Sequence, residues 1–477
     1  MEKRLFIAFF ATLVFMTAWM YFSPKPIQEK IAQQPAISAN APENKFLKPS
    51  QNIQFEHPEE SALPTANIGN VSITYSPKGG YLRLLSIKGN AEPLFFENIG
   101  FRPEDENTIY NAAVDGNKLI FKAGGGKKKV FSFNKYLLEI NVEPHPAGPM
   151  LIFSNNLKSS GLDQRYQEVF SSKEGAIKRN APKKTKNQSL EKVDFAGARD
   201  RYYCISLVKG SYDIQWEKSS ETAGLYLSNI NGPVSVYIGP QTEKELEPYG
   251  LQKIMYYGFF HAIGMLMVKI LYIFYALTKS WGLSIILFAV TIYGVLFPFT
   301  MKSTQAMRKM QQIQPYVEEL KTKFKDNPQK IQKETLQLYR KYKVNPLGGC
   351  LPLFLQFPIF IALYQVLFRF TGLKGASFLW IKDLSLPDRL IKLPFDIPFL
   401  GQYLNVLPLA IMVVGLIQQK ITTSTKAASE QKSMGIFFSL FLGIIFYNFP
   451  SSLVLYWFVQ NALTLLYQFR ISKKTVL

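Results

Sequence analysis

No charged side chain interrupts Trp281-Gly-Leu-Ser-Ile-Ile-Leu-Phe-Ala-Val-Thr-Ile-Tyr-Gly-Val-Leu-Phe-Pro-Phe299. An apolar stretch of this length is what an α-helix needs to cross the hydrocarbon core of a bilayer. Four further stretches without an acidic residue follow, at 348–368, 403–419, 434–447 and 451–469. The sequence therefore predicts a region of five membrane-spanning helices, within residues 281–470.

Basic residues are concentrated around these stretches. The chain has a net charge of +21, yet 23–247 holds 28 basic and 25 acidic residues, against 27 and 9 in the remainder. The loop 302–346 carries 11 basic and 4 acidic residues, and 372–401 carries 4 and 3. Because Lys and Arg accumulate in cytoplasmic loops, we expect 302–346 to lie in the cytoplasm. The excess also suits contact with anionic lipid or RNA.

The N-terminus begins with an apolar run from Leu5 to Phe22 that follows Lys3 and Arg4. The run is long and ends in bulky residues rather than a small-residue cleavage site. This predicts an uncleaved signal-anchor span at 1–22 with its N-terminus in the cytoplasm. Residues 23–51 are rich in Pro, Ala, Gln and Asn, which predicts a flexible tether.

Residues 52–245 show strand patterns. Val71–Tyr75 alternates apolar and polar residues, and similar runs such as Tyr136–Val142 follow between Gly, Asn and Pro. We expect an antiparallel β-sandwich on the outer side of the membrane. Within it, the basic and polar segment 173–192 predicts a mobile loop.

The segment 246–280 decides the topology. It is apolar from Met255 onward but contains His261, Lys269 and Lys279. A lysine at the bilayer centre costs about 2.5–3.5 kcal/mol, and a crossing here would move 302–346 outside. We therefore expect an amphipathic helix along the outer interface. The predicted class is an α+β membrane protein with six spans, both termini and the short tail 471–477 in the cytoplasm, and a periplasmic β domain.

The cytoplasmic loop 302–346 has helical periodicity on both sides of Asp326-Asn-Pro328, which predicts an antiparallel helical hairpin. Two interpretations remain open. The hairpin is either a solvated element that obeys the charge rule, or a docking surface for a ribosome or a targeting factor, whose RNA attracts cations. The basic residues concerned are Lys302, Arg308, Lys309, Lys321, Lys323, Arg340 and Lys341.

Signals for catalysis are weak. The three histidines, His57, His145 and His261, lack metal-ligand spacing. The glycine-rich 124–129 lacks the first glycine of a phosphate loop. The spans hold no carboxylate, which disfavours an ion-coupled transporter. With only Cys204 and Cys350, a disulfide framework is excluded. We predict no enzyme activity, no metal and no cofactor.

The spans do contain uncharged polar side chains. An unpaired amide in hydrocarbon costs roughly 2–7 kcal/mol, so these groups must pair between helices or line a hydrated groove. They are Thr291, Tyr293, Gln356, Tyr364, Gln365, Asn405, Gln418, Tyr456, Gln460, Asn461 and Gln468.

Three stretches resemble the YidC/Oxa family of bacterial membrane protein insertases. The most specific is Val344-Asn-Pro-Leu-Gly-Gly-Cys-Leu-Pro-Leu-Phe-Leu-Gln-Phe-Pro-Ile-Phe-Ile-Ala-Leu-Tyr364. It is flanked in the expected order by Trp281-Gly-Leu-Ser-Ile-Ile286 and Phe449-Pro-Ser-Ser-Leu-Val-Leu-Tyr456. Ile238-Gly-Pro240 also matches, and the similarity covers about 192–469.

The resemblance implies an insertase and chaperone that guides client segments into the inner membrane through a polar groove, alone or with the Sec translocon. Implied partners are client membrane proteins and lipid, with a ribosome or signal recognition particle machinery at the hairpin, and no DNA. The expected groove residues are Thr291, Tyr293, Gln356, Tyr364, Gln460, Tyr456 and Trp457. Tyr293 stands where the family usually has an arginine, so our hypothesis is a neutral, hydrated groove.

Two other functions stay open. One is a scaffold for membrane-protein assembly without autonomous insertion. The other is a membrane-anchored carbohydrate-active enzyme, because β-sandwiches also occur in sugar-converting proteins and a fold alone does not give function.

Overall fold

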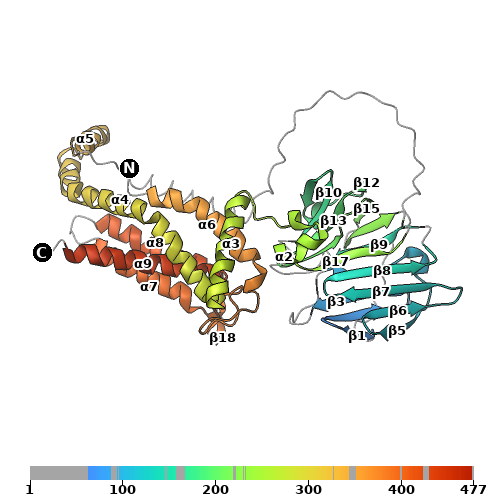
Figure 1. Ribbon diagram of the computed structural model, residues 1–477. Helices are drawn as coiled ribbons and strands as arrows, with labels where there is room; N and C mark the ends of the chain where they lie inside the picture. Colours follow the sequence, from blue (N-terminus) through green and yellow to red (C-terminus); the bar gives the residue numbers. More distant parts are fainter. Residues whose placement is uncertain are drawn as a thin grey trace, which may run out of the picture. The chain divides into compact units, whose positions relative to one another are not determined.

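The computed structural model describes residues 63–474 except 88–93, 95, 146–147, 157–166, 219–221, 229, 231, 326, 343–350, 398–399 and 423–428. The predicted anchor 1–22 and tether 23–51 lie outside the described residues. A β-rich region up to Pro240 is followed by a helical region, so the α+β class agrees with the prediction (Figure 1).

Three antiparallel sheets form the β-rich region, with orders β11-β10-β13-β14-β17-β8-β7-β6-β5, β12-β15-β16-β9-β4 and β1-β2-β3. The strands are β1 Thr65–Ile68, β2 Val71–Ser76, β3 Tyr81–Ile87, β4 Phe96–Glu97, β5 Asn111–Asp115, β6 Lys118–Lys122, β7 Lys128–Asn134, β8 Leu137–Glu143, β9 Met150–Asn156, β10 Glu168–Lys173, β11 Ala176–Asn180, β12 Gln188–Val193, β13 Phe195–Arg199, β14 Tyr203–Leu207, β15 Tyr212–Lys218, β16 Thr222–Ser228 and β17 Val234–Pro240.

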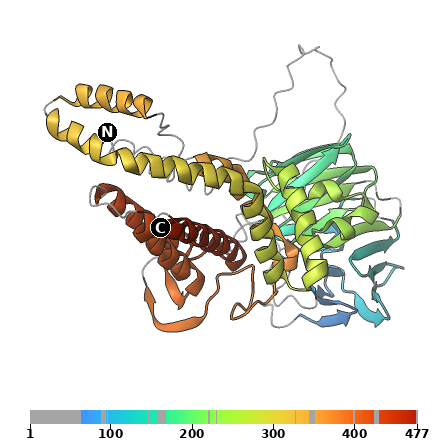
Figure 2. The same ribbon diagram turned by 60° about the vertical axis from the view of Figure 1, so that its left-hand side comes forward.

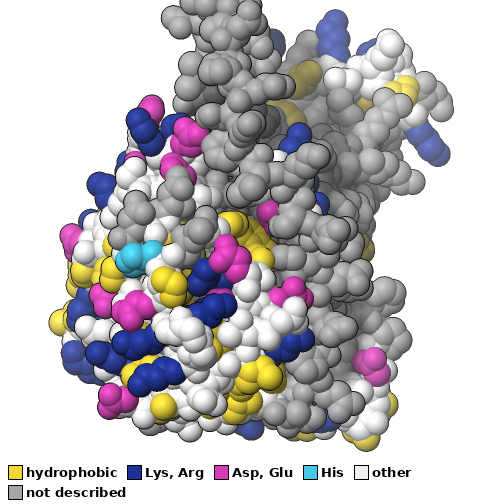
Figure 3. Space-filling view, turned by 90° about the vertical axis from the view of Figure 1, so that its right-hand side faces the viewer, with side chains coloured by type: hydrophobic (Ala, Val, Ile, Leu, Met, Phe, Trp, Pro, Cys, Tyr) yellow, Lys and Arg dark blue, Asp and Glu magenta, His cyan; other side chains and the backbone are white. Residues whose placement is uncertain are grey.

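One hydrophobic core joins these sheets. Strands β7 and β8 bury every second residue, as expected for strands with one apolar face. Ile73 of the three-stranded sheet, Phe131 of the nine-stranded sheet and Trp216 of the five-stranded sheet belong to the same buried cluster. On the face shown in Figure 3, acidic and basic side chains alternate with small apolar areas, in keeping with the balanced charge of this region.

The prediction of a mobile loop at 173–192 was wrong. Strand β11 pairs with β10 along its length, from Val169 opposite Asn180 to Lys173 opposite Ala176. A tight turn joins them, because Glu174 and Gly175 adopt positive φ angles of 53° and 77°. Strand β11 is the edge of its sheet and exposes alternate residues, so its polar sequence concealed the strand.

The helix expected over 246–280 is shorter than predicted. Helix α2 (Glu243–Leu246) is followed by the 3-10 turns η5 (Glu247–Tyr249) and η6 (Gln252–Ile254), and only α3 (His261–Thr278) is a continuous helix. Left-handed glycines at Gly250 and Gly258 break the helical path. Helix α3 buries Gly264, Met267, Val268 and Leu271 and exposes apolar residues on its other side.

Helix α4 (Trp281–Lys323) continues without interruption from the predicted span 281–299 into the predicted hairpin 302–346. Helix α5 (Pro328–Lys341) lies against its distal half, around the buried Ile313 and Val317 (Figure 2). Asn327 caps α5 by accepting a hydrogen bond from the backbone N–H of Lys330 at 3.0 Å. Helix α4 thus ends, and α5 begins, at the predicted break.

The remaining helices are α6 Leu351–Arg369, α7 Val406–Thr422, α8 Ser429–Phe446 and α9 Ser451–Lys474. Helix α9 contacts α4, α6 and α7, and the short strands β18 (Ile391–Ile397) and β19 (Gly401–Leu404) form a hairpin between α6 and α7. Among the described residues, α3 and α4 are long and apolar enough to cross a membrane, and α7 and α8 contain shorter apolar segments.

Candidate functional site

A cluster of three polar side chains joins α4, α6 and α9. The side-chain amide of Gln356 in α6 donates a hydrogen bond to the hydroxyl of Tyr456 in α9 at 2.9 Å. Gln460, one helical turn after Tyr456, donates to the same hydroxyl at 3.3 Å and to the carbonyl of Ala289 in α4 at 2.9 Å. We call Gln356, Tyr456 and Gln460 the polar cluster.

The polar cluster lies inside an apolar surrounding. Tyr456 is fully buried, and the ring of Phe288 lies 6.1 Å from its ring. Burying an amide without a partner costs roughly 2–7 kcal/mol, which the mutual hydrogen bonds avoid. The sequence left two alternatives for polar residues in the apolar helices, pairing between helices or lining a hydrated groove. For these three residues, pairing between helices accounts for their presence.

Tyr293 and Thr291 point in different directions from α4. The hydroxyl of Tyr293 donates to the carbonyl of Leu463 in α9 at 3.3 Å. Thr291 is exposed, and its hydroxyl donates to the carbonyl of Leu287 in its own helix at 2.9 Å. Tyr293, at the position where the resemblance implies an arginine, is thus hydrogen-bonded to α9, and Thr291 does not contact the same group.

The face of α4 that carries Thr291 is uncovered. Gly294 lies one turn further and is exposed, and a Cβ atom added there would meet no atom within 4 Å. Val290 and Val295 are 44% and 65% exposed. This face can therefore contact lipid or another polypeptide without displacing any described side chain.

The other predicted groove residues, Tyr364 and Trp457, lie among aromatic rings. Tyr364 stacks on Phe368 at 5.3 Å between ring centroids. Trp457 packs edge-on against Phe360 at 5.4 Å and in a tilted arrangement against Phe446 at 5.5 Å, both between ring centroids. The indole Nε1 of Trp457 is buried and has no hydrogen-bond partner in the described part of the chain. An unpaired indole donor is costly in apolar surroundings.

A second contact, between α7 and α9, uses two further polar residues. Gln418 donates to the carbonyl of Asn461 at 2.8 Å, and the Asn461 amide donates to the carbonyl of Trp457 at 2.8 Å. Helix α8 packs closely on α7 through Gly443, where a Cβ atom would come within 2.2 Å of Met412. Small residues allow such close approach of membrane helices.

Asp388 is a structural residue that the sequence did not reveal. Its Oδ2 accepts hydrogen bonds from the backbone N–H groups of Val406 and Leu407, at 2.7 and 2.9 Å, and from Trp380 Nε1 at 3.3 Å. It thus caps the first turn of α7 while only 4% exposed. A capping residue normally directly precedes its helix, and Asp388 lies 18 positions away, so no local pattern could identify it.

The basic hairpin residues lie on the surfaces of α4 and α5. Lys302, Lys309, Lys323, Arg340 and Lys341 are exposed, whereas Arg308 and Lys321 are half-buried. The described residues contain no group of three or more His, Cys, Asp or Glu side chains that could hold a metal. Burial raises the pKa of the Cys204 thiol far above its ordinary value, which disfavours a reactive thiolate.

Comparison with known proteins gives consistent matches. The family model described as "60Kd inner membrane protein" matches residues 273–476. A protein of Pelobacter propionicus named "Membrane protein insertase YidC" is 28% identical and the match covers 99% of each chain. The namesake of Syntrophobacter fumaroxidans is 42% identical over 50% of this chain and 43% of its own length.

The chain spans about half the length of several relatives, including the protein of Endomicrobium trichonymphae with the same name, which is 38% identical over 53% of its length. Among solved structures, "Active YidC insertase crystal structure with the first transmembrane domain resolved" shares 16% identity, with a TM-score of 0.44 and coverage of 85% of this chain and 93% of that one. The predicted resemblance to the YidC-type family is confirmed.

Proposed function

We propose, on the premise that this chain is a relative of the YidC-type insertases, that it is a membrane protein insertase and chaperone of the bacterial inner membrane. The observation that carries the proposal is the polar cluster, which places two amides and a hydroxyl where three otherwise apolar helices meet. Its clients are membrane proteins, whose hydrophobic segments it guides into the bilayer.

The mechanism we propose lowers the cost of moving polar backbone through hydrocarbon. Each unsatisfied backbone group costs several kcal/mol there. Gln356, Tyr456 and Gln460 hold hydrogen bonds with each other, and these bonds can be exchanged for bonds to a client segment. The proposed groove also includes Tyr293, Tyr364 and Trp457, and Thr291 is proposed as a further contact of the client on the uncovered face of α4.

The aromatic residues of α6 and α9 supply a path for the apolar part of the client. Trp457 and Phe360 present ring surface, and the unpaired Nε1 of Trp457 is a donor for a client carbonyl. A client helix can slide along this surface into lipid once its polar flank has reached the groove.

Attraction of the client does not depend on a charge in the groove. Tyr293 occupies the position of the family's usual arginine, and its hydroxyl is held by the carbonyl of Leu463. We therefore propose that neutral hydrogen-bonding groups bind the polar flank of the client. Such a groove favours neutral polar segments over strongly acidic ones.

For topology, we propose six spans and an outer β-sandwich. The common core of the nine- and five-stranded sheets supports the sandwich. Helix α3 passes a test of length and composition for a span, but Lys269 is exposed between Leu266 and Ile273 on its outer face. An interfacial position lets Lys269 reach water while its apolar neighbours contact lipid.

For partners, we propose the Sec translocon and a ribosome or signal recognition particle machinery, the latter at the exposed basic residues of α4 and α5. The activity needs no covalent chemistry, so the protein is proposed not to be an enzyme. Neither partner is required for the basic mechanism.

The test is insertion into liposomes that contain only this purified protein. The client is a small single-span protein with a short outer tail, and protease protection of the tail is measured against protein-free liposomes. Protection well above the protein-free background supports autonomous insertion. No gain, with the protein shown to be folded and correctly oriented, rejects it in favour of the assembly scaffold.

A further inference from the structure

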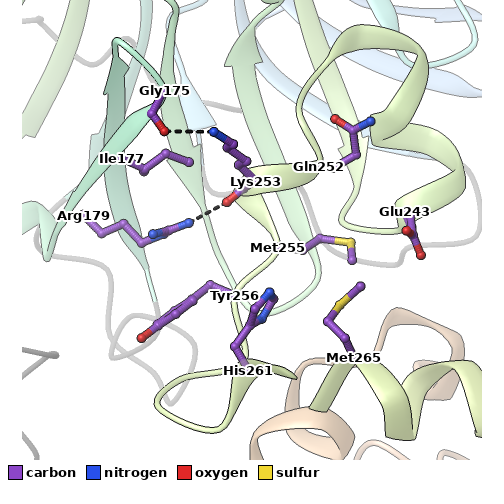
Figure 4. A pocket seen from close by; sticks show the side chains of 10 residues that line it. All are labelled: Gly175, Ile177, Arg179, Glu243, Gln252, Lys253, Met255, Tyr256, His261 and Met265. Carbon is purple, nitrogen blue, oxygen red and sulfur yellow. Dashed lines mark hydrogen bonds between the residues drawn. The ribbon is translucent and has the colours of Figure 1, made fainter. Parts of the chain in front are cut away.

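A pocket of about 430 Å³ lies between the β-rich region and the start of α3 (Figure 4). One wall comes from the β10–β11 hairpin with Arg179, and another from the η6 segment with Lys253. His261 and Met265 of α3 complete it. None of these residues belongs to the proposed groove.

One side of the pocket carries cations that are held in place by the backbone. Arg179 Nη2 donates to the carbonyl of Lys253 at 2.6 Å, and Lys253 Nζ donates to the carbonyl of Gly175 at 3.0 Å. The Nε atom of Arg179 is buried and has no hydrogen-bond partner in the described part of the chain. The planar guanidinium of an arginine that lines a pocket is suited to bind an anion.

His261 adds a neutral donor. Its Nδ1 accepts a hydrogen bond from the backbone N–H of Tyr257 at 3.3 Å, so in the neutral ring the proton is assigned to Nε2. The ring stacks on Tyr256, whose own ring lies 4.8 Å from the Arg179 guanidinium. The aromatic and cationic groups therefore form one ordered wall.

The electrostatic surroundings favour an anion. Burial and then the charge of Arg199 lower the pKa of Arg179 to about 10, which means that its charge lacks solvent and a sufficient counter-charge. Glu168 is already paired with Arg199 at 2.6 Å. Glu243 also lines the pocket, on the side opposite Arg179 (Figure 4).

The other side of the pocket is apolar. The side chains of Met255 and Met265 face each other across it (Figure 4). Next to the pocket, exposed apolar residues lie just before α3 and in its first turns: Phe259 is 87% exposed and Leu266 is 59% exposed. A ligand with an anionic head and an apolar tail would therefore match both sides.

We propose that this pocket binds the phosphate headgroup of an anionic phospholipid of the outer leaflet. Arg179, Lys253 and His261 contact the phosphate, and the acyl chains leave past Met265 along the exposed face of α3. The inference rests on the proposed interfacial position of α3, which places the start of that helix among lipid headgroups. Such a bound lipid would fasten the β domain to the membrane surface.

The test is native mass spectrometry of the purified full-length protein in a neutral detergent. Dioleoylphosphatidylglycerol is added, with dioleoylphosphatidylcholine as the neutral comparison. In the double variant Arg179→Gln, Lys253→Gln, we expect the Kd of the most tightly bound phosphatidylglycerol molecule to rise by about tenfold, because charge-assisted hydrogen bonds are lost. The matched control Lys178→Gln, Lys183→Gln removes the same charge from exposed positions and should leave that Kd within about twofold.

Equal losses in variant and control would reduce the effect to general electrostatics and overturn the proposal. Competition by inorganic phosphate at concentrations similar to the lipid would also overturn it, because the occupant would then be a free anion. If the double variant does not fold, Lys253→Glu, at an exposed position, must still weaken binding more than Lys178→Glu. Lipid binding is measured without a client, so its failure is distinguishable from failure of insertion.

Discussion

The β-rich region and the membrane helices bury polar groups in opposite ways. In the β-rich region, Asp105 and Lys129 are both fully buried, and their side chains form an ion pair at 3.0 Å. Lys127 and Arg102 add contacts of 3.0 and 3.6 Å to the same carboxylate. In the polar cluster of the helices, every group is neutral.

The difference reflects what each region must do. A buried ion pair is costly to open, because either partner alone is an uncompensated charge. Neutral hydrogen bonds between membrane helices contribute only about 0.6 kcal/mol on average, so they can be exchanged for bonds to another molecule. The ion pairs suit a rigid domain, and the exchangeable hydrogen bonds of the polar cluster suit the proposed groove, which would have to release a client.

Asp105→Ala should produce the largest effect. It leaves Lys129 buried without its counter-charge, so the free energy of unfolding of the β-rich region should fall by about 3–5 kcal/mol. Denaturant unfolding measures it, followed by tryptophan fluorescence in a background in which the other four tryptophans are replaced by phenylalanine, so that the buried Trp216 is the reporter. The control is Lys135→Ala, which removes the exposed partner of Glu245 and should leave unfolding unchanged. If both substitutions lowered the free energy of unfolding equally, burial of the Asp105–Lys129 ion pair would not be what makes it important for stability.

Lowering the pH should weaken the same ion pair, with a smaller loss of stability than the Asp105→Ala substitution causes. Burial would raise the pKa of Asp105, but the Lys129 ammonium and hydrogen bonds from Lys129 and Lys127 bring it below its ordinary value. A lowered carboxyl pKa stabilises the fold above the unfolded pKa of about 4, and this stability is lost as the pH falls through the folded pKa. Unfolding followed by tryptophan fluorescence as the pH is lowered from neutral to below about 4 should show the loss, and Asp105→Asn should reduce the pH dependence.

Gln356→Leu with Gln460→Leu should affect function more than stability. Both substitutions remove neutral hydrogen bonds, so we expect a stability change of about 1 kcal/mol or less. The insertion rate in liposomes should fall about fivefold, because the client loses two amide partners. Gln418→Leu is the matched control, since it removes an amide from the α7–α9 contact instead. Equal rates for the double variant and the wild type would exclude the polar cluster from insertion.

Tyr293→Phe and Thr291→Val should give the smallest effects. Each should lower the insertion rate about twofold, because each removes one hydroxyl. Their effects should multiply in the double variant, since the two side chains lie on different faces of α4 and share no partner. Unchanged rates in the double variant would contradict the neutral groove, and Ile292→Val serves as the control.

Much of the fold followed from local patterns. The uncharged stretch 281–299 begins at the first residue of α4, and the break at Asp326-Asn-Pro328 separates α4 from α5. The patterns failed at β11, whose polar edge strand resembled a loop, and at 246–260, where Gly250 and Gly258 interrupt the expected helix. In both cases a tertiary contact or a backbone angle overrode the composition.

The site could be predicted only as a set of candidates. The sequence named Gln356, Tyr456 and Gln460 as polar residues in apolar helices, without saying which of them meet. It did not separate Thr291 from Tyr293, and it offered no signal for Asp388 or for the pocket around Arg179.

By itself, the sequence determined the helical membrane region, the β-rich region before it and the family resemblance, because hydrophobic period, charge asymmetry and motif order are properties of neighbouring residues. Only the tertiary structure decided which polar groups pair. Gln356 and Tyr456 are 100 positions apart in the sequence, and Gln460 and Ala289 are 171 positions apart. Such hydrogen bonds form because packing of the apolar faces brings the helices together, and their energy depends on that geometry rather than on any local pattern.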